Sequence, residues 1–295
     1  MNAYEQLDFV RDIIGESVAA HWSSLGLLRR LNLAQKKLAA ELAMTPGDWF
    51  VKSSTVTLSD GTFSLPADCS KPLYLEDATG SPVNWLSGGI KYRRVSRALN
   101  GTPFIGNSEA YSLGNTVEIN AEGVSGTYTL WYQRRVPDLH CGFAGANCAE
   151  GALHLDTSTT EAITSNDLGT GSAIKFVDNY YEGVYVEIID STSGITNIKS
   201  QITAFTASTA LATITGTPSE NDVYGTISIL PEECHQLMAF DTAILALMKP
   251  GAKLDKEALQ YIRAEYASQK EIFIAWASSR IAKQDDIAIG RLYEY

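Results

Sequence analysis

An apolar stripe near the start of the chain constrains the fold more than any other feature of the sequence. Between residues 23 and 42, apolar side chains recur at steps of four, three, four and four, the spacing that lines one face of an α-helix. The stripe consists of Leu27, Leu31, Ala34, Leu38 and Leu42. The chain that follows, up to about residue 230, alternates in the manner of strands and turns. A helix this apolar must be covered, so its partner is predicted to lie near the other end of the chain.

Two further helices are predicted in the last quarter of the chain. Pro231 opens the first, with Glu232 and Glu233 in the first turn, where negative charge suits the helix dipole. This helix is apolar on nearly every side, which predicts that it is buried among others. The second helix covers about residues 254–282, with a stripe formed by Leu259, Ile262, Tyr266, Phe273, Ala277 and Ile281.

The two ends of the chain are therefore expected to form one helical bundle. A weaker helix is predicted over residues 3–20, with Gly15 as a point at which it can be interrupted. Residues 1–50 and 231–295 are the expected halves of the bundle. After residue 282 we expect an extended tail.

The middle of the chain is predicted to be β-structure. Short alternating runs bounded by turn residues predict an antiparallel β-module over residues 51–136 and a second, inserted one over residues 137–230. Asp60-Gly61 is a hairpin signal. Residues 137–152 are rich in small residues and are predicted to be a loop or linker. The predicted fold class is α+β, a bundle of N- and C-terminal helices with a long β-rich insertion.

Composition narrows the classes of partner. The net charge of −11 disfavours non-specific binding to nucleic acid, which requires clusters of Lys and Arg. No window approaches the roughly 18 uninterrupted apolar residues of a membrane helix, and no basic segment precedes an apolar one at the N-terminus. We expect a protein that is soluble and cytosolic when made, with no membrane partner.

The sequence lacks the familiar motifs of catalysis. It has no phosphate-binding loop, no nucleophile elbow and no paired Cys-x-x-Cys, and it predicts neither an enzyme nor a cofactor. The best metal candidate is the group His140, Cys141, Cys148 and His154, which offers two thiols and two imidazoles. Its spacing matches no common zinc finger. A disulfide between the two cysteines and an ordinary loop are the alternatives, and no metal site is predicted.

One buried acid needs an explanation. Asp241 shares a helical face with apolar residues, where a carboxylate must be paired or solvated. We expect an arginine of a neighbouring helix as its partner, or a place at the edge of the bundle.

The apolar helix of residues 23–42 also carries a basic face away from its leucine stripe. Arg29, Arg30, Lys36 and Lys37 form this face, which is either a docking surface or a solvated side of the helix.

Two stretches resemble structural proteins of tailed bacteriophages. The first, "LLRRLNLAQKKLAAELAMTPGDWFVKSSTVTLSDGTFSLPADCSKPLYLED", resembles the opening of head-to-tail connector proteins, also called adaptor or neck proteins. The second, "YYEGVYVEIIDSTSGITNIKSQITAFTASTALATITGTPSENDVY", is similar to a small β-module of many phage structural proteins. The positions that carry the first resemblance are Leu31, Asn32, Ala34, Gln35, Trp49, Phe50, Leu65, Pro66 and Asp68.

The resemblance implies a protein without catalysis that assembles as a homo-oligomeric ring of twelve copies beneath the portal. Such a ring would form part of the DNA channel at the neck of the virion, and its negative charge would let DNA pass without specific binding. The portal and a tail or further neck protein are the implied partners. The C-terminal segment of the chain, after residue 282, has too many apolar residues for a solvated end, and we expect it to dock on a neighbouring protein. Its candidate residues are Ile287, Ile289, Arg291, Leu292, Tyr293 and Tyr295.

Two other functions fit parts of the sequence. A tail accessory or tail-terminator protein would also suit the β-modules. A carbohydrate-binding protein would use exposed tyrosines, and the run "NYYEGVY" at residues 179–185 is its only support.

Overall fold

The structure is a computed structural model that describes residues 1–16, 21–45, 47–85, 109–119, 125–143, 154–155, 177–189, 196–207, 211–214, 222–248 and 256–292. The chain divides into two compact units. The bundle unit combines Met1–Gly47 with Val136–Tyr295, and the barrel unit is Asp48–Arg135.

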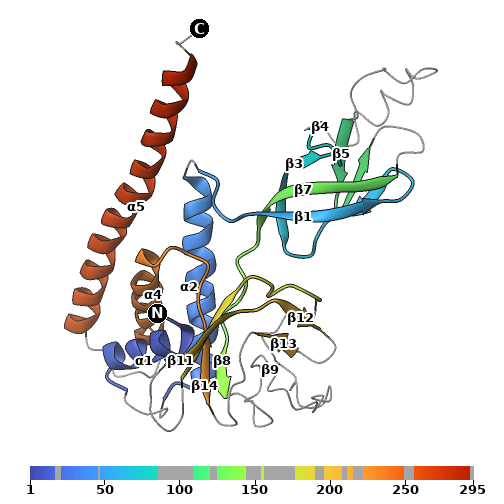
Figure 1. Cartoon of the computed structure of the whole chain (residues 1–295). Helices are drawn as coiled ribbons and strands as arrows, with labels where there is room; N and C mark the ends of the chain where they lie inside the picture. Colours follow the sequence, from blue (N-terminus) through green and yellow to red (C-terminus); the bar gives the residue numbers. More distant parts are fainter. Residues whose placement is uncertain are drawn as a thin grey trace. The chain divides into compact units, whose positions relative to one another are not determined.

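The helices of the bundle unit come from both ends of the chain, as the sequence predicts (Figure 1). Helix α4 packs against each of the other three. The α+β class with a β-rich insertion is thereby confirmed. The helices are α1 (Ala3–Ile14), α2 (Ser24–Met44), α4 (Glu233–Leu247) and α5 (Lys256–Leu292).

The leucine stripe of α2 finds its partner in α4. All five stripe residues are buried, and α2 packs on α4, which is itself buried on most sides. Helix α5 joins α2 through an ion pair, with 2.8 Å between Lys270 Nζ and Glu41 Oε1. The predicted burial of the stripe among the C-terminal helices is confirmed, with α4 as its main partner.

The ends of α1 and α2 follow from their capping residues. Asn2 caps α1 through a reciprocal capping box with Glu5, and Gly15 ends the helix in the left-handed conformation at φ 69°. Helix α1 is therefore shorter than the predicted span of residues 3–20. Ser23 caps α2, and its Oγ accepts from the Gly26 N–H at 3.1 Å.

Helix α5 corrects the prediction of an extended tail. It continues without a break to Leu292 and has 37 residues. The physical reason is that residues 283–292 contain no proline, so one glycine alone does not stop a helix that is already propagating. The inner stripe is as predicted at Leu259, Ile262, Phe273 and Ala277, which are buried, and at Tyr266, which is half-buried. The side chain of Ile281 lies outside the described residues.

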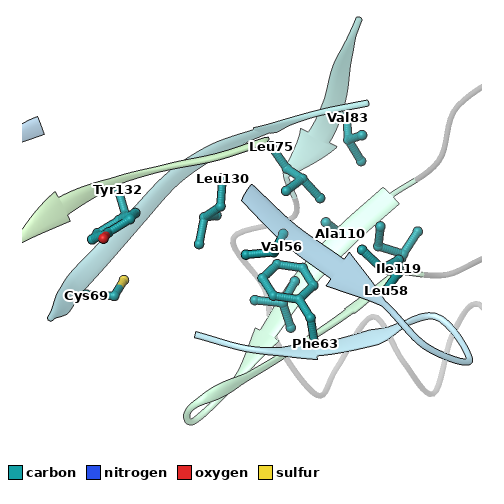
Figure 2. Packing of buried hydrophobic residues seen from close by; sticks show 11 residues of the cluster. Val56, Leu58, Phe63, Cys69, Leu75, Val83, Ala110, Ile119, Leu130 and Tyr132 are labelled. Atoms are coloured by element: carbon teal, nitrogen blue, oxygen red, sulfur yellow. The ribbon is translucent and has the colours of Figure 1, made fainter. Parts of the chain in front are cut away.

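The barrel unit is one curled, mostly antiparallel sheet. Its strand order is β1-β7-β3-β4-β5-β6-β2, and among the described strands of this unit β4 and β5 are the one pair that runs in parallel. The first and last strands of this order are the two arms of the predicted hairpin, in which Asp60 and Gly61 both have positive φ, 52° and 73°. The sheet encloses a core that includes Phe63, Leu75 and Leu130 (Figure 2). The strands are β1 (Val51–Leu58), β2 (Thr62–Ser64), β3 (Cys69–Glu76), β4 (Pro82–Trp85), β5 (Glu109–Leu113), β6 (Thr116–Ile119) and β7 (Gly126–Arg134).

Two small sheets complete the bundle unit. The first has the order β11-β10-β14-β8 and the second the order β12-β13-β9. Tyr181, Phe205 and Tyr224 are fully or almost fully buried in the core that these strands form. The strands are β8 (Cys141–Phe143), β9 (His154–Leu155), β10 (Tyr185–Ile189), β11 (Thr196–Gln201), β12 (Ala204–Thr206), β13 (Leu211–Thr213) and β14 (Val223–Thr226).

The predicted loop or linker at residues 137–152 is confirmed only in part, because residues 137–140 lie in no helix or strand but are buried, and Cys141–Phe143 form strand β8. Leu139 and His140 are buried, and β8 pairs with β14. The small residues of this segment allow close packing and do not mark a free loop. Residues 144–152 lie outside the described part of the chain.

Candidate docking surfaces

The motif residues Asn32 and Gln35 of α2 face inward. Asn32 donates from Nδ2 to the Leu139 carbonyl at 3.0 Å and accepts from the Leu139 N–H at 2.6 Å. Gln35 donates from Nε2 to the Pro137 carbonyl at 2.7 Å. Buried backbone groups that belong to no helix or sheet need such partners. The two amides therefore fasten the segment after residue 135 onto α2.

The motif residue Asp68 has an equivalent role in the barrel unit. Its buried carboxylate accepts from Tyr132 Oη at 2.8 Å and lies 3.2 Å from Arg134 Nε and 3.3 Å from Lys52 Nζ. Burial and the Asp68 carboxylate both raise the pKa of Tyr132. The role of these three motif residues, Asn32, Gln35 and Asp68, is thus structural. Their side chains are buried and are not exposed for binding to a partner.

The arginines and lysines of the basic face of α2 have different surroundings. The Arg30 guanidinium lies over the Trp22 ring, 3.9 Å from its centre, and donates to the Gly26 carbonyl at 3.1 Å. Arg29 is exposed. These two residues keep the beginning of α2 positively charged.

The lysines of the same face are paired within the bundle unit. Lys36 pairs with Asp138, and Lys37 Nζ lies 3.1 Å from Asp241 Oδ1. Burial alone would lower the pKa of Lys37, but the hydrogen bond and the charge of Asp241 raise it. Asp241 is therefore paired, as expected, but its partner is a lysine of α2 and the expectation of an arginine was wrong.

A second, outward stripe on α2 was not predicted from the sequence. Leu33 and Met44 are 59% and 84% exposed, and Ala40 between them is exposed as well. Leu33 and Ala40 are seven residues apart, close to two helical turns, so they share one side of the helix. The seven-residue interval was the signal that could have revealed this stripe.

Helix α5 has an outward stripe too. Tyr261 is 72% exposed and Ile272 67% exposed. Glu257 and Glu271 are exposed beside them. Large apolar side chains gathered on one exposed helix face are typical of a protein–protein interface.

For the predicted docking residues of the C-terminal segment, the structure describes the backbone. Ile287, Ile289, Arg291 and Leu292 belong to the last turns of α5. Tyr293 and Tyr295 lie outside the described residues.

The candidate metal ligands make other contacts where they are described. His140 is buried, and its Nε2 lies 2.9 Å from Tyr181 Oη. Burial raises the pKa of the Cys141 thiol to about 12. Cys148 lies outside the described residues, and His154 is described only as part of β9. Within the described ranges, no three potential metal-ligating side chains come together.

The tyrosines proposed for carbohydrate binding are largely internal. Tyr180 and Tyr181 are buried in the core below β10, and Tyr185 alone of the three is exposed. A carbohydrate platform needs aromatic faces at the surface. The run "NYYEGVY" therefore serves packing, which removes the support for that function.

The comparisons with known proteins agree with the resemblance seen in the sequence. Residues 1–144 match the family model described as SU10 adaptor protein. The matched part includes α1, α2, the barrel unit and the motif residues Asn32, Gln35 and Asp68. No curated protein matches the chain. In the parts of the chain that the structure describes, no helix combines the length and apolarity needed to cross a membrane. The first half of the chain is therefore similar to phage adaptor proteins, which supports a structural component of a phage virion.

Proposed function

We propose that the chain is a head-to-tail adaptor that assembles as a ring, docks beneath the portal and lines part of the DNA channel. The match of residues 1–144 to the adaptor family carries this proposal. The structural role of the motif residues is consistent with it, since Asn32, Gln35 and Asp68 stabilise the fold.

The charge of the chain supports a place beside passing DNA. With a net charge of −11, most of the surface repels phosphate groups. A channel wall with this charge would not retain the genome during packaging or ejection.

The exposed apolar residues support an assembly. Leu33, Met44, Tyr261 and Ile272 would cost solvation free energy in an isolated chain, and covering them in an oligomer removes that cost. A ring requires a heterologous interface that repeats around an axis.

Negative-stain electron microscopy of the purified chain, alone and mixed with its portal protein, tests the proposal. Rings with a central channel in either sample are expected, and their symmetry would give the copy number, for which we propose twelve. Monomers in both samples would overturn the docking role and favour a tail accessory protein.

A further inference from the structure

The outward stripe of α2 is flanked by positive charge. Arg29 and Lys36 lie on one side of Leu33 along the helix, and Arg30 and Lys37 lie on the other. Buried carboxylates pair with the two lysines, and the two arginines add positive charge at the first turns of the helix.

The outward stripe of α5 is flanked by negative charge. Its members recur at steps of three, four, four and three residues, the helical repeat, and all are exposed. The acids Glu257, Glu265 and Glu271 stand beside it. The stripe consists of Tyr261, Ala264, Ser268, Ile272 and Ala275. The serine is its one polar member, and its side chain is small.

The two stripes cannot cover each other within one chain. Helix α5 uses its opposite face, with Leu259 and Ile262, to pack on α4. The ion pair between Lys270 and Glu41 fixes α5 along its flank. Because a helix is rigid, its outward face points away from the bundle to which its inward face is attached. Both stripes are thus exposed in the described part of the chain, and a second copy of the chain is the occupant considered for each.

We propose that the α5 stripe of one copy packs on the α2 stripe of the next copy. This inference rests on the proposed ring, and it names the two surfaces that would build it. The apolar residues of both stripes are buried in the contact, and the glutamates of α5 face the arginines of α2. Because the two surfaces differ, each copy offers one and receives one, and the contact repeats until the ring closes.

Two single variants test this pairing. L33E disrupts the α2 stripe, and I272E disrupts the α5 stripe. Each variant alone is expected to run as a 32.0 kDa monomer in size-exclusion chromatography with light scattering, whereas the unchanged chain forms rings. I274E is the matched control, since Ile274 is an exposed isoleucine on another side of α5. It should still form rings.

The decisive measurement mixes the two monomeric variants. L33E keeps an intact α5 stripe and I272E keeps an intact α2 stripe, so the mixture should form a one-to-one dimer of about twice the monomer mass that cannot grow. Rings formed by either variant alone, or a mixture that stays monomeric, would overturn the pairing. Circular dichroism of both variants checks that they are folded. If the unchanged chain forms no ring with or without the portal, the proposed function itself fails.

Discussion

Asn32 of α2 binds both backbone groups of Leu139, its amide donating to the carbonyl and accepting from the N–H, at a separation of 107 residues in the sequence. One side chain thus replaces the partners that a neighbouring strand would supply. This explains why a polar residue stands in the buried half of an apolar helix.

Asn32→Ala should destabilise the chain strongly. It leaves the N–H and C=O of the buried Leu139 without these partners, at about 1–3 kcal/mol for each group, so we expect a loss of about 2–6 kcal/mol. Urea unfolding followed by circular dichroism measures it. Ala43→Ser, at an exposed site of the same helix, is the control and should change stability by less than about 0.5 kcal/mol. Equal stability of the two variants would contradict the role assigned to Asn32.

Gly225→Ala should also destabilise, for a steric reason. A Cβ at Gly225 of β14 would lie 2.7 Å from Asn2 Oδ1 and 2.9 Å from the backbone N of Tyr4. Backbone atoms cannot move aside as a flexible side chain can, so we expect a loss of about 1–3 kcal/mol. Thermal unfolding tests it, and an unchanged midpoint would show that the start of α1 does not rest on β14.

Three of the cysteines should be inert in the folded chain. Burial raises the pKa of Cys69 to about 11 and of Cys141 and Cys234 to about 12. Since the thiolate is the reactive form, alkylation by iodoacetamide at pH 8 should be slow until the chain is unfolded in urea. Mass spectrometry of each peptide reads the sites separately. Rapid native alkylation of Cys69 or Cys234 would contradict their burial.

Glu187 should make stability depend on pH. Burial raises its pKa, but the hydrogen bond from Asn2 and the ammonium of Lys199 lower it more, so it lies below the ordinary 4.5. The folded state then binds the proton less tightly than the unfolded state, and the contribution is present above pH 4.5 and lost as pH falls through the lowered value.

Glu187→Gln should therefore cost about 1 kcal/mol at pH 7. The difference from the unchanged chain should shrink as the pH falls below 4.5 and through the lowered pKa of Glu187. Urea unfolding at several pH values between 3 and 8 measures it. A difference that does not change with pH would rule out the carboxylate as its source.

A chain ending at Ala282 should separate folding from docking. It keeps the buried stripe of α5 and should unfold at nearly the same temperature as the full chain. It also keeps the outward stripe, so rings should still form. It loses Ile287, Ile289 and the residues after them, and binding to the portal or the neighbouring tail protein should fall below detection in a pull-down. Undiminished binding would show that the tail is not the docking segment.

Much of this architecture could be predicted because periodic apolar spacing reports burial directly. The stripe of α2, the inner stripe of α5 and the Asp60-Gly61 hairpin are all local patterns. The union of the two chain ends followed from the need to cover an apolar helix. Gly15 stopped α1 where its left-handed φ allowed a cap.

What escaped prediction depended on contacts between distant residues. The segment after Pro137 resembles a loop because its partners are single polar side chains, Asn32 and Gln35, and such pairs leave no periodic signal. The same holds for Lys37 and Asp241, which are 204 residues apart. The outward stripe of α2 was missed because a search for one buried face passes over a second apolar face.

The barrel unit is one continuous segment of the chain, whereas the bundle unit is made of two segments. This difference sets the order in which the two units can fold during synthesis. The barrel unit is one uninterrupted segment and can fold as soon as the ribosome releases it, whereas α2 must wait for α4. About 190 residues separate the two helices, which takes roughly 10–40 s of translation. During that time the leucine stripe is exposed to water. The nascent chain is therefore expected to need a chaperone that binds apolar helices, although the finished protein buries that stripe completely.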